Sequence, residues 1–567
     1  MAAGSRTFTL EESFLEPQAI DPPPTRHALL ILLLILAALL HLGTAGWGEL
    51  YNGAEGRLAG AAREMLETRQ WFLPTNDGVP LLQTPPLAHW LIIFSYELFG
   101  VSPMAARLPG AIATIASIGL TFFIGEQLAG YWRGFAAALI YLCSAGTFLL
   151  GRSVTPAPIF SAFIAGAVFC LICGYQRRRF RRAWFAGFWL CTSFGCLTSG
   201  LTALFYLAAL CALLAFFFRE ARVRFPLLLH WSYLLVFILM VGPWFVWAGW
   251  HFRGFFPYSL GWLSQDGVPR WRFFILHLVW WFPALLLVLP GLLFAARKII
   301  RPHDIGFADA LPLCWIAVGL ILPLLLGERT AASSMSMWPA FALWAACAWE
   351  RTPPPLRFAA ISALILVGAI GGIVSLLPEN FAHLLTENIP FATLLALRPL
   401  LQIASIALLI FAALALYFAA QSHPEIALVV VLSSMIPIGL CLAEGTIRIA
   451  PFFSFAAAAD FLNRHADKDR RVLYEGPLDT ASSLTFYLNQ KFFLVNQQPA
   501  RFEQNAEAEE KYLDENYVLQ AWNRADPIYL IVPQSRTAHW EKLVTVQVHI
   551  YHQVTTCGHY VVLSNEL

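Results

Sequence analysis

Residues 28–46 read ALLILLLILAALLHLGTAG, a continuous run that contains no charged side chain. A helix needs about 20 mostly apolar residues to cross the hydrocarbon core of a bilayer, so this run is long enough to span one. The segment before it is acidic and ends in three consecutive prolines, whereas a signal peptide begins with a positively charged region. We therefore expect residues 28–46 to form a retained membrane anchor and residues 1–27 to form a cytoplasmic tail.

The composition of the whole chain has the same apolar character. Of its 567 residues, 58% are hydrophobic and 13% are charged, and the mean hydropathy is +0.62. Soluble globular domains carry about 25% charged residues, so a water-soluble enzyme and a disordered or collagen-like chain are both excluded. The net charge of +2 gives no electrostatic argument for binding nucleic acid. Nine of the ten cysteines lie in apolar runs, where a thiol behaves as a small hydrophobe, so we expect no disulfide framework.

Hydrophobic runs recur along the chain and predict about thirteen membrane-spanning helices. They lie at residues 28–46, 108–129, 134–150, 159–175, 184–198, 201–218, 233–250, 273–296, 310–326, 335–349, 358–377, 400–420 and 426–443. The run at 88–99 is too short to span a bilayer and contains Glu97, so we expect an interfacial or re-entrant helix there. The expected fold class is an all-α polytopic membrane protein with a transmembrane domain over residues 28–443.

The positions of Lys and Arg give the orientation of these spans, because short cytoplasmic loops are enriched in basic residues. With the N-terminus in the cytoplasm, the inner loops contain Arg177, Arg178, Arg179, Arg181, Arg182, Arg219, Arg222, Arg224, Arg297, Lys298, Arg301, Arg351 and Arg357. We interpret the first five as a topology anchor rather than as a site for nucleic acid or a specific lipid. The sequence thus predicts an integral protein of the plasma (inner) membrane whose C-terminal end lies outside the cytoplasm.

Residues 444–567 differ from the rest of the chain, because charged residues return and short β-like runs appear. The β-like runs are Arg471–Tyr474, Lys491–Asn496, Pro527–Pro533 and Tyr560–Ser564, and helical stretches such as Ala456–His465 and Glu507–Gln520 lie between them. This alternation predicts a small α/β domain, which the topology places on the extracytoplasmic side.

The first predicted outer loop, residues 47–106, contains an amphipathic stretch at Ala54–Thr68. Its apolar stripe consists of Leu58, Ala61, Ala62, Met65 and Leu66, and most of its charged residues lie off that stripe. We expect such a helix to lie in the membrane interface. It could be no more than a surface connector, or Glu55 and Arg57 at its start could line a cavity between the loop and the spans.

This loop carries an ordered series of motifs. They are Glu55-Gly56-Arg57, Ala62-Arg63-Glu64-Met65-Leu66, Trp71-Phe72-Leu73-Pro74, Pro85-Pro86-Leu87-Ala88-His89-Trp90, Leu98-Phe99-Gly100-Val101 and Ala106-Arg107-Leu108-Pro109. In order and spacing the series resembles the first outer loop of the aminoarabinose-transferase and protein O-mannosyltransferase family. These proteins are C-type (GT-C) polytopic membrane glycosyltransferases with about thirteen spans and, in bacterial members, an outer C-terminal α/β domain.

The resemblance implies a specific chemistry. The donor would be a sugar linked to polyprenyl phosphate in the outer leaflet, and the acceptor would be a lipid, an envelope glycan or a protein. Glu55, as the carboxylate in the first outer loop, would act as the base, because the attacking oxygen must lose a proton. The departing phosphate needs cationic stabilisation, so the resemblance leaves room for a divalent metal ion, although no cluster in the sequence has convincing metal-ligand spacing. Membrane lipids are the other implied partners, and no protein partner can be assigned.

Several positions depart from the pattern of the family. Ala54 stands where the family has an Asp, and alanine cannot accept a proton. Gln83 and Thr84 replace an acidic residue and a Lys that would face phosphate. Further polar positions are missing at Thr155-Pro156-Ala157-Pro158, Thr198-Ser199-Gly200 and Ala331-Ala332-Ser333.

Three functions therefore remain open. In an active transferase Glu55 would be the surviving base, and the substrate would contact Arg57, Gln83, Thr84, His89, Arg152, Arg270 and Arg329, the last three at the donor phosphate. In a catalytically impaired relative the scaffold would bind a lipid-linked substrate or assist a partner, and the same residues would serve as interfacial anchors, ion pairs or, for Glu55, a helix N-terminal charge. A transporter is the third alternative, but the spans show no inverted repeat and almost no buried charge.

Overall fold

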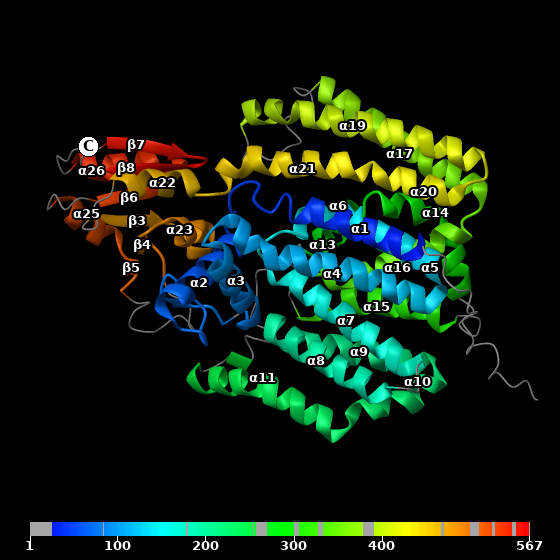
Figure 1. Ribbon diagram of the computed structural model, residues 1–567. Coiled ribbons are helices and arrows are strands. Elements are labelled where there is room, and N and C mark those ends of the chain that lie inside the picture. The colour runs from blue at the N-terminus through cyan, green and yellow to red at the C-terminus, as the bar shows by residue number, and fades with distance from the viewer. Residues whose placement is uncertain are drawn as a thin grey trace, which may run out of the picture.

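The computed structural model describes residues 25–82, 84–176, 180–252, 255–256, 269–299, 306–326, 333–377, 390–465, 470–498, 510–523, 528–546 and 552–565. They form a large helical bundle followed by a mixed sheet with its own helices (Figure 1). The C-terminal sheet lies at one end of the bundle, on the left of the figure, together with helices α2 and α3.

The bundle and the loops that cover it consist of helices and one short hairpin. The helices are α1 (Thr25–His41), α2 (Ala54–Thr68), α3 (Leu87–Phe99), α4 (Pro103–Ala129), α5 (Tyr131–Leu142), α6 (Ala145–Leu150), α7 (Pro156–Gln176), α8 (Arg181–Ser199), α9 (Thr202–Phe217), α10 (Arg219–Arg224), α11 (Trp231–His251), α13 (Arg270–Trp280), α14 (Ala284–Ile299), α15 (Phe307–Leu326), α16 (Trp338–Arg351), α17 (Pro354–Leu376), α19 (Phe391–Ala420), α20 (Pro424–Ser433) and α21 (Met435–Ile449). Strands β1 (Thr75–Asn76) and β2 (Val79–Pro80) make an antiparallel hairpin, and short 3-10 helices lie at Phe225–Leu229, Met335–Met337 and Ala450–Phe452.

Seven helical segments in the described part of the chain are long and apolar enough to cross a membrane. They are Pro103–Ala129, Pro156–Gln176, Trp231–His251, Phe307–Leu325, Pro354–Leu376, Thr393–Ala420 and Pro424–Phe452. An eighth would be the pair Trp271–Trp280 and Ala284–Gly291, which is bent by 103° at its break. The chain is thus a mostly helical integral membrane protein, as its composition predicts.

The predicted number of about thirteen spans is not reached by this count, although each predicted span overlaps a described helix. Some of those helices are too short to span a bilayer by themselves, since α16 has 14 residues and α9 has 16. The predicted span at 134–150 is interrupted between α5 and α6, where Cys143 and Ser144 leave the helical conformation. The exact number of spans therefore stays a prediction.

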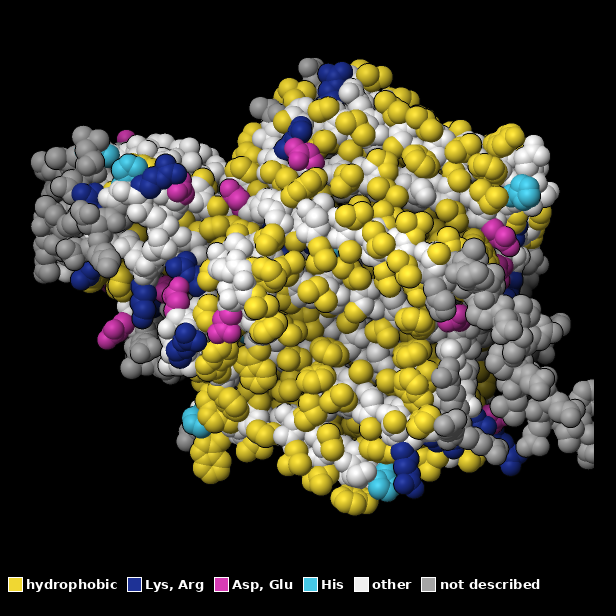
Figure 2. All heavy atoms as spheres, in the orientation of Figure 1, with side chains coloured by type: hydrophobic (Ala, Val, Ile, Leu, Met, Phe, Trp, Pro, Cys, Tyr) yellow, Lys and Arg dark blue, Asp and Glu magenta, His cyan; other side chains and the backbone are white. Residues whose placement is uncertain are grey.

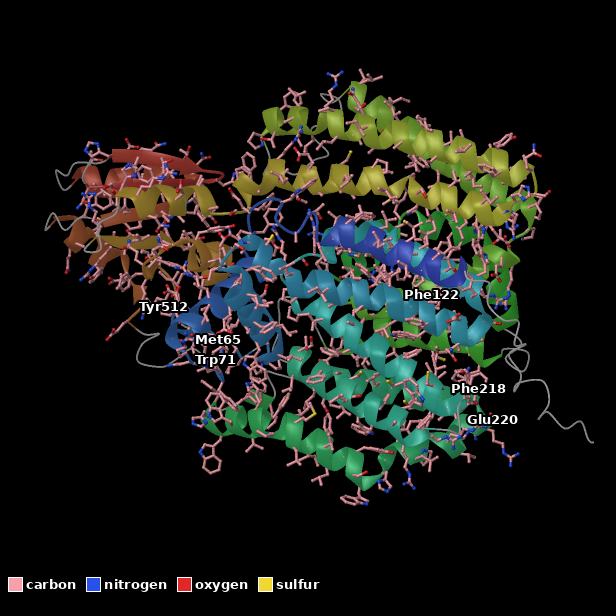
Figure 3. The ribbon with its side chains drawn as sticks, in the orientation of Figure 1. Met65, Trp71, Phe122, Phe218, Glu220 and Tyr512 are labelled. Atoms are coloured by element: carbon pink, nitrogen blue, oxygen red, sulfur yellow. The ribbon has the colours of Figure 1, made fainter. Side chains whose placement is uncertain are left out.

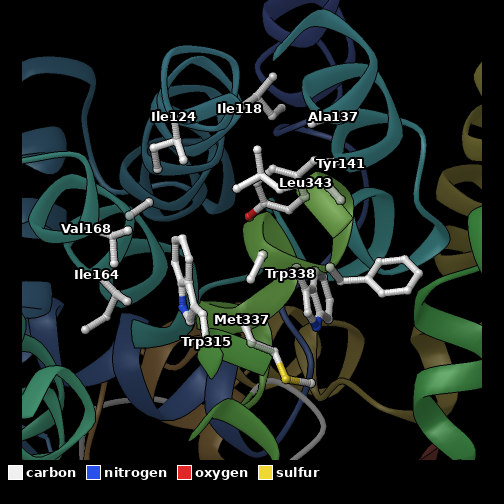
Figure 4. Close-up of a cluster of buried hydrophobic side chains, with 14 of the residues drawn as sticks. Ile118, Ile124, Ala137, Tyr141, Ile164, Val168, Trp315, Met337, Trp338 and Leu343 are labelled. Carbon is white, nitrogen blue, oxygen red and sulfur yellow. The ribbon is translucent and has the colours of Figure 1, made fainter. Parts of the chain in front are cut away.

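The surface and the interior of the bundle are both apolar. Figure 2 shows hydrophobic side chains over most of the bundle, with charged side chains gathered mainly on the C-terminal part and toward the far end of the bundle. Large side chains such as Phe216 and Leu32 are 73% and 62% exposed, which suits contact with lipid rather than water. The interior is packed with aromatic and aliphatic groups, and Tyr141, Trp315 and Trp338 meet there (Figure 4).

The C-terminal part is a six-stranded sheet with helices on it. Its elements are α22 (Ala456–His465), β3 (Arg471–Glu475), α23 (Ser482–Tyr487), β4 (Phe492–Val495), β5 (Tyr512–Leu513), α25 (Glu515–Asn523), β6 (Ile528–Pro533), α26 (Thr537–Val546), β7 (His552–Cys557) and β8 (Tyr560–Ser564), with 3-10 turns at Leu478–Ala481 and Gln534–Arg536. The strand order is β5-β4-β3-β6-β8-β7. Strands β5, β4, β3 and β6 are parallel to one another, and β8 is antiparallel to both of its neighbours, β6 and β7. The predicted helix at 507–520 is wrong in part, because residues 512–513 pair with β4 as a strand.

The two faces of this sheet are both covered, which explains the run of apolar residues along each central strand. Val472 and Tyr474 contribute to the core on one face, and Leu473 between them contributes to the core on the other. Helix α22 and α23 supply residues to the first core, while α25 and α26 supply residues to the second. Helix α23 lies on the side of the domain that meets the first loop, and it therefore connects the sheet with the candidate site.

Candidate functional site

The apolar stripe of helix α2 packs against protein in the described structure, and the expected place of this helix in the membrane interface stays a prediction. Leu58, Ala61, Ala62 and Met65 are buried at 0–4% exposure, and the stripe packs in one cluster with residues of α3, α4, α7 and α23. The pattern is the one expected for any helix that buries one face, and it does not distinguish a protein partner from a lipid surface. In this molecule the apolar face of α2 is covered by protein.

Glu55, the predicted base, lies in the first turn of α2 and points toward the bundle. Its Oε2 accepts N–H groups from Tyr51 and from the Arg107 guanidinium, both at 3.2 Å, and its Oε1 accepts the backbone N–H of Val154 at 3.1 Å. The Glu55 and Arg107 side chains are only 11% and 6% exposed. Both carboxylate oxygens of Glu55 are therefore held by donors within the protein.

Arg107, near the start of α4, is the central residue of the site, and our sequence analysis did not select it. Besides Glu55, its guanidinium donates to four backbone carbonyl groups in the segment just after α1. The acceptors are the carbonyl oxygens of Ala45 at 3.3 Å, Trp47 and Gly48 at 2.9 Å, and Glu49 at 2.7 Å. The signal in the sequence was a single cation inside the apolar start of a span, where an ionisable residue suggests a function.

Arg152, a predicted phosphate ligand, lies in the same cluster. It is buried, and it donates to the Thr44 carbonyl at 2.8 Å and to the Thr446 hydroxyl at 3.3 Å. Burial and then the positive charge of Arg107 lower the pKa of Arg152 to about 10, so the side chain remains charged at neutral pH. The hydroxyl of Tyr51 donates to the Thr446 carbonyl, and burial raises the pKa of Tyr51 to about 12. The site thus joins α2, α4, the loop before α7 and α21.

Arg57 lies on the other side of α2 and does not support Glu55. Its Nη1 is 2.9 Å from Oδ1 of Asp479, in the C-terminal domain, and the two side chains are 26% and 56% exposed. Residues two positions apart on a helix face in different directions, which explains why Glu55 faces the bundle and Arg57 faces the domain. Glu55 and Arg57 therefore have different partners in the structure, and a role of Arg57 in substrate binding stays a prediction.

Of the remaining predicted residues, only Thr84 and His89 have described side chains, and neither has a hydrogen bond to the cluster. Thr84 is half-buried after the β1–β2 hairpin. His89 on α3 is fully buried, and neither ring nitrogen makes a hydrogen bond of good geometry, although the Pro85 carbonyl lies near. Arg270 begins α13, but its side chain is not among the described ones, and Gln83 and Arg329 lie outside the described residues, as do Ala331 and Ala332.

A second ionic contact fixes the hairpin of the first loop. Asp77, at the turn of the hairpin, forms a buried ion pair with Lys511, whose ammonium group also donates to the Asp77 carbonyl at 3.1 Å. Burial lowers the pKa of Lys511, and the negative charge of Asp77 opposes that change. Glu64 on α2 accepts the N–H groups of Asp77 and Gly78 and the Thr75 hydroxyl. The hairpin is thus bound both to α2 and to the C-terminal domain.

A metal ion finds no suitable ligand group in the described parts of the chain, where no cluster of three His, Cys, Asp or Glu side chains could hold one. The charged side chains of the cluster are instead two arginines and one carboxylate that contacts Arg107. This donor set suits an anionic ligand rather than a metal cation.

The proteins that this chain resembles in sequence include several that are named as glycosyltransferases. A family model described as dolichyl-phosphate-mannose-protein mannosyltransferase matches residues 83–247. An undecaprenyl phosphate-alpha-4-amino-4-deoxy-L-arabinose arabinosyl transferase of Pseudomonas fluorescens is 27% identical over 45% of this chain and 44% of its own length. One from Pectobacterium atrosepticum is 25% identical over 51% of this chain and 53% of its own. The chain matches less than half the length of the first curated relatives it resembles.

Solved structures extend the likeness in fold to almost the full chain. ArnT from Cupriavidus metallidurans in the apo state has a TM-score of 0.79 at 18% identity, covering 95% of this chain and 98% of ArnT. The same protein bound to undecaprenyl phosphate has a TM-score of 0.78 at 19% identity, covering 96% and 98%. At such identity the likeness establishes the fold alone. Sequence and fold together confirm that the chain resembles the aminoarabinose-transferase and protein O-mannosyltransferase family of GT-C polytopic membrane glycosyltransferases.

Proposed function

We propose that this protein is a membrane glycosyltransferase that moves a sugar from a polyprenyl-phosphate-linked donor to an acceptor outside the cytoplasm. The acceptor would be a lipid, an envelope glycan or a protein. The observation that carries the proposal is the buried pair Arg107 and Arg152, which lies at the end of the bundle where the first loop and the C-terminal domain meet. The relatives in sequence are named for transfer from undecaprenyl phosphate, and a neighbour in fold was solved with that lipid.

The two arginines favour a phosphate because their charges are incompletely compensated. Arg152 forms no ion pair among the described residues, and its two hydrogen bonds go to neutral oxygens. Glu55 forms an ion pair with Arg107, and no carboxylate among the described residues forms one with Arg152. Removing a cation from water costs several kcal/mol unless an anion accompanies it, so a phosphate at Arg152 would relieve that cost. An arginine there would also stabilise the charge that develops on the leaving phosphate.

The role of Glu55 follows from its contacts. Its oxygens already accept three N–H groups, so it can take a proton from an acceptor only if one of these bonds opens. This observation favours a second candidate function, in which the protein binds a polyprenyl-phosphate sugar without transferring it. Ala54, beside Glu55, has no group that could replace the base.

One experiment separates the two functions. Glu55→Gln and wild type are purified in detergent and supplied with undecaprenyl phosphate carrying a radiolabelled sugar. Transfer by wild type and its loss in Glu55→Gln, with donor binding retained, would support the transferase with Glu55 as base. A full rate in Glu55→Gln would exclude this base, and binding without transfer in wild type would favour the second function. The absence of binding in both proteins would contradict both.

We also propose the topology that the transferase requires, with residues 1–27 in the cytoplasm, about thirteen spans, and residues 444–567 outside the cytoplasm. Met65 and Trp71 lie at the end that carries the C-terminal domain, whereas Phe218 and Glu220 lie at the opposite end, beside the arginines of α10 (Figure 3). A cysteine introduced at Glu67 should react with a membrane-impermeant maleimide in spheroplasts, and one introduced at Arg222 should react only after lysis. The reverse labelling pattern would show that the topology is the inverse of the proposed one.

A further inference from the structure

We infer that the C-terminal domain is part of the functional site, because Asn52 and Ser483 position Glu55. This inference rests on the proposed function, since it assigns a task to Asn52 in the chemistry of Glu55. Asn52 is a positioning residue and not a catalytic one, because its contacts are with the domain and not with the charged cluster. The segment 47–55, which connects α1 to α2 and ends in Glu55, is the part of the chain concerned.

Asn52 connects this segment to helix α23 and to the start of the C-terminal domain by hydrogen bonds. Its Oδ1 accepts the backbone N–H of Ser483 at 3.1 Å and the Ser483 hydroxyl at 2.6 Å. Its backbone N–H donates to the Phe453 carbonyl at 2.7 Å. The Ser483 hydroxyl in turn accepts the N–H of Phe455 at 2.9 Å, and Ser483 is fully buried. Hydrogen bonds that converge on one buried hydroxyl hold the groups they join in one arrangement.

The residue before α2 is held in the same way by the neighbouring serine. Gly53 has a φ of +85°, a conformation that favours glycine, and it provides no side chain to cap the helix. The Ser482 hydroxyl accepts the Gly53 N–H at 2.7 Å and donates to the Gly53 carbonyl at 3.0 Å. The Asp479 carbonyl also accepts the Gly53 N–H at 3.0 Å. The start of α2 is thus fixed by groups of the C-terminal domain and not by its own sequence.

Two glycines of α2 allow this close contact. A Cβ at Gly56 would lie 2.5 Å from the backbone nitrogen of Ser483, and a Cβ at Gly60 would lie 2.1 Å from the Thr485 hydroxyl. Real Cβ atoms do not approach other atoms so closely, so any larger residue would push α23 away. The sequence therefore preserves, one turn apart on α2, the space that α23 needs.

The segment 47–55 is held from two sides as a result. Arg107 binds the carbonyl groups of Trp47, Gly48 and Glu49 from the bundle, and Ser482 and Ser483 bind Gly53 and Asn52 from the domain. Glu55 follows directly and contacts both Arg107 and the N–H of Tyr51. A displacement of Asn52 therefore moves Glu55 relative to Arg107, and a misplacement of about 1 Å can cost about a hundredfold in rate.

The test compares two substitutions of Asn52, one to alanine and one to the similarly shaped aspartate. Asn52→Ala removes the acceptor, whereas Asn52→Asp keeps an Oδ1 that can accept both bonds from Ser483. We expect kcat to fall about ten- to a hundredfold in Asn52→Ala with KM for the donor unchanged, and to be close to wild type in Asn52→Asp. Arg63→Ala is the matched control, because Arg63 binds the Phe486 and Leu488 carbonyls of the same interface away from Glu55.

A double-mutant cycle shows whether Asn52 acts through Glu55. We expect Asn52→Ala/Glu55→Gln to be no slower than Glu55→Gln alone. Once residue 55 has lost its carboxylate, a further displacement of its side chain should not lower the rate. Additive losses, equal losses in Asn52→Asp and Asn52→Ala, or a loss of kcat in Arg63→Ala as large as that in Asn52→Ala would each overturn the inference.

A second measurement keeps the inference testable if the proposed function fails. If wild type transfers no sugar, or if Glu55→Gln keeps the full rate, hydrogen exchange of the backbone amides of Gly56 and Arg57 decides. These amides bond to the Tyr51 and Gly53 carbonyls. Faster exchange in Asn52→Ala, but not in Arg63→Ala, would support the positioning of this turn by the domain, and unchanged exchange would overturn it.

Discussion

The two faces of α2 differ in how they are held. The face toward the bundle carries Glu55, which is joined to the buried cation Arg107 and to backbone N–H groups. The face toward the C-terminal domain carries Gly56 and Gly60, where two backbones approach closely, and its exposed margin carries the ion pair of Arg57 and Asp479. The first face thus includes a buried ion pair, and the second includes a close backbone contact that only glycine permits.

This difference predicts which kind of substitution lowers the stability of the protein on each face of α2. A buried ion pair stabilises a structure only while both partners are present, since loss of one leaves the other unpaired in a medium of low dielectric constant. A glycine contact has no partner to lose, but it tolerates no added atom. Deletion should therefore be costly on the bundle face, and addition should be costly on the domain face.

The largest effect is expected for Arg107→Ala on the bundle face. The substitution leaves Glu55 buried without its cation and removes the donor from four carbonyl groups, so we expect a loss of about 3–5 kcal/mol in the free energy of unfolding. SDS-driven unfolding in mixed micelles measures it. Arg57→Ala is the control, because its ion pair is partly exposed and is worth less than about 1 kcal/mol. Equal costs for the two variants would mean that the faces do not differ.

The next largest effect concerns His89, and it depends on pH. Burial lowers the pKa of His89 to about 3, from 6.5 in the unfolded chain. The unfolded chain therefore binds the extra proton between these values, and stability is full above pH 6.5 and falls by about 1.4 kcal/mol per pH unit below it. At pH 4.5 wild type should have lost about 2–3 kcal/mol more than His89→Phe. Parallel pH profiles of the two proteins would show that His89 is not buried in its neutral form.

A smaller effect is expected on the domain face for Gly60→Ala. The added methyl group meets the Thr485 hydroxyl, and overpacking of this kind costs about 1–3 kcal/mol. Gly372→Ala is the control, because no atom lies within 4 Å of a Cβ at that position in α17, and alanine there should stabilise the helix by about 0.5–1 kcal/mol. Thr485→Ala should restore part of the loss in Gly60→Ala. Melting temperatures in detergent suffice, and a neutral Gly60→Ala would contradict the close packing of α2 and α23.

Much of this architecture is readable in the sequence, because lipid imposes a strong pattern. Apolar runs predict helices such as α4, α7 and α19, and alternation of β-like runs with helical stretches predicts β3, β4, β6 and β8 at the positions where they occur. The motif series in the first loop predicts the family resemblance that the comparisons confirm. Local patterns of this kind depend on residues that are near in sequence.

The site itself is less predictable, because its contacts join residues that are far apart. Glu55 and Arg152 were both selected from the sequence, but nothing local indicates that Arg107 links Glu55 to the carbonyl groups after α1. Arg57 and Asp479 are separated by 422 positions, so a sequence pattern could not show that Arg57 turns away from Glu55. An amphipathic stripe does not distinguish a protein partner from a lipid surface, so the sequence could not show that the stripe of α2 packs against other helices of this chain.

The bond between Asn52 and Ser483 has a consequence for how the molecule is made. Its partners are 431 positions apart, and the second is synthesised close to the end of the chain. At roughly 5–20 residues per second, a ribosome needs about 20–90 s between them. In a nascent polypeptide the segment around Glu55 would therefore lack its partner in the C-terminal domain while the bundle is inserted, and this contact would form only after that domain has been synthesised and has folded.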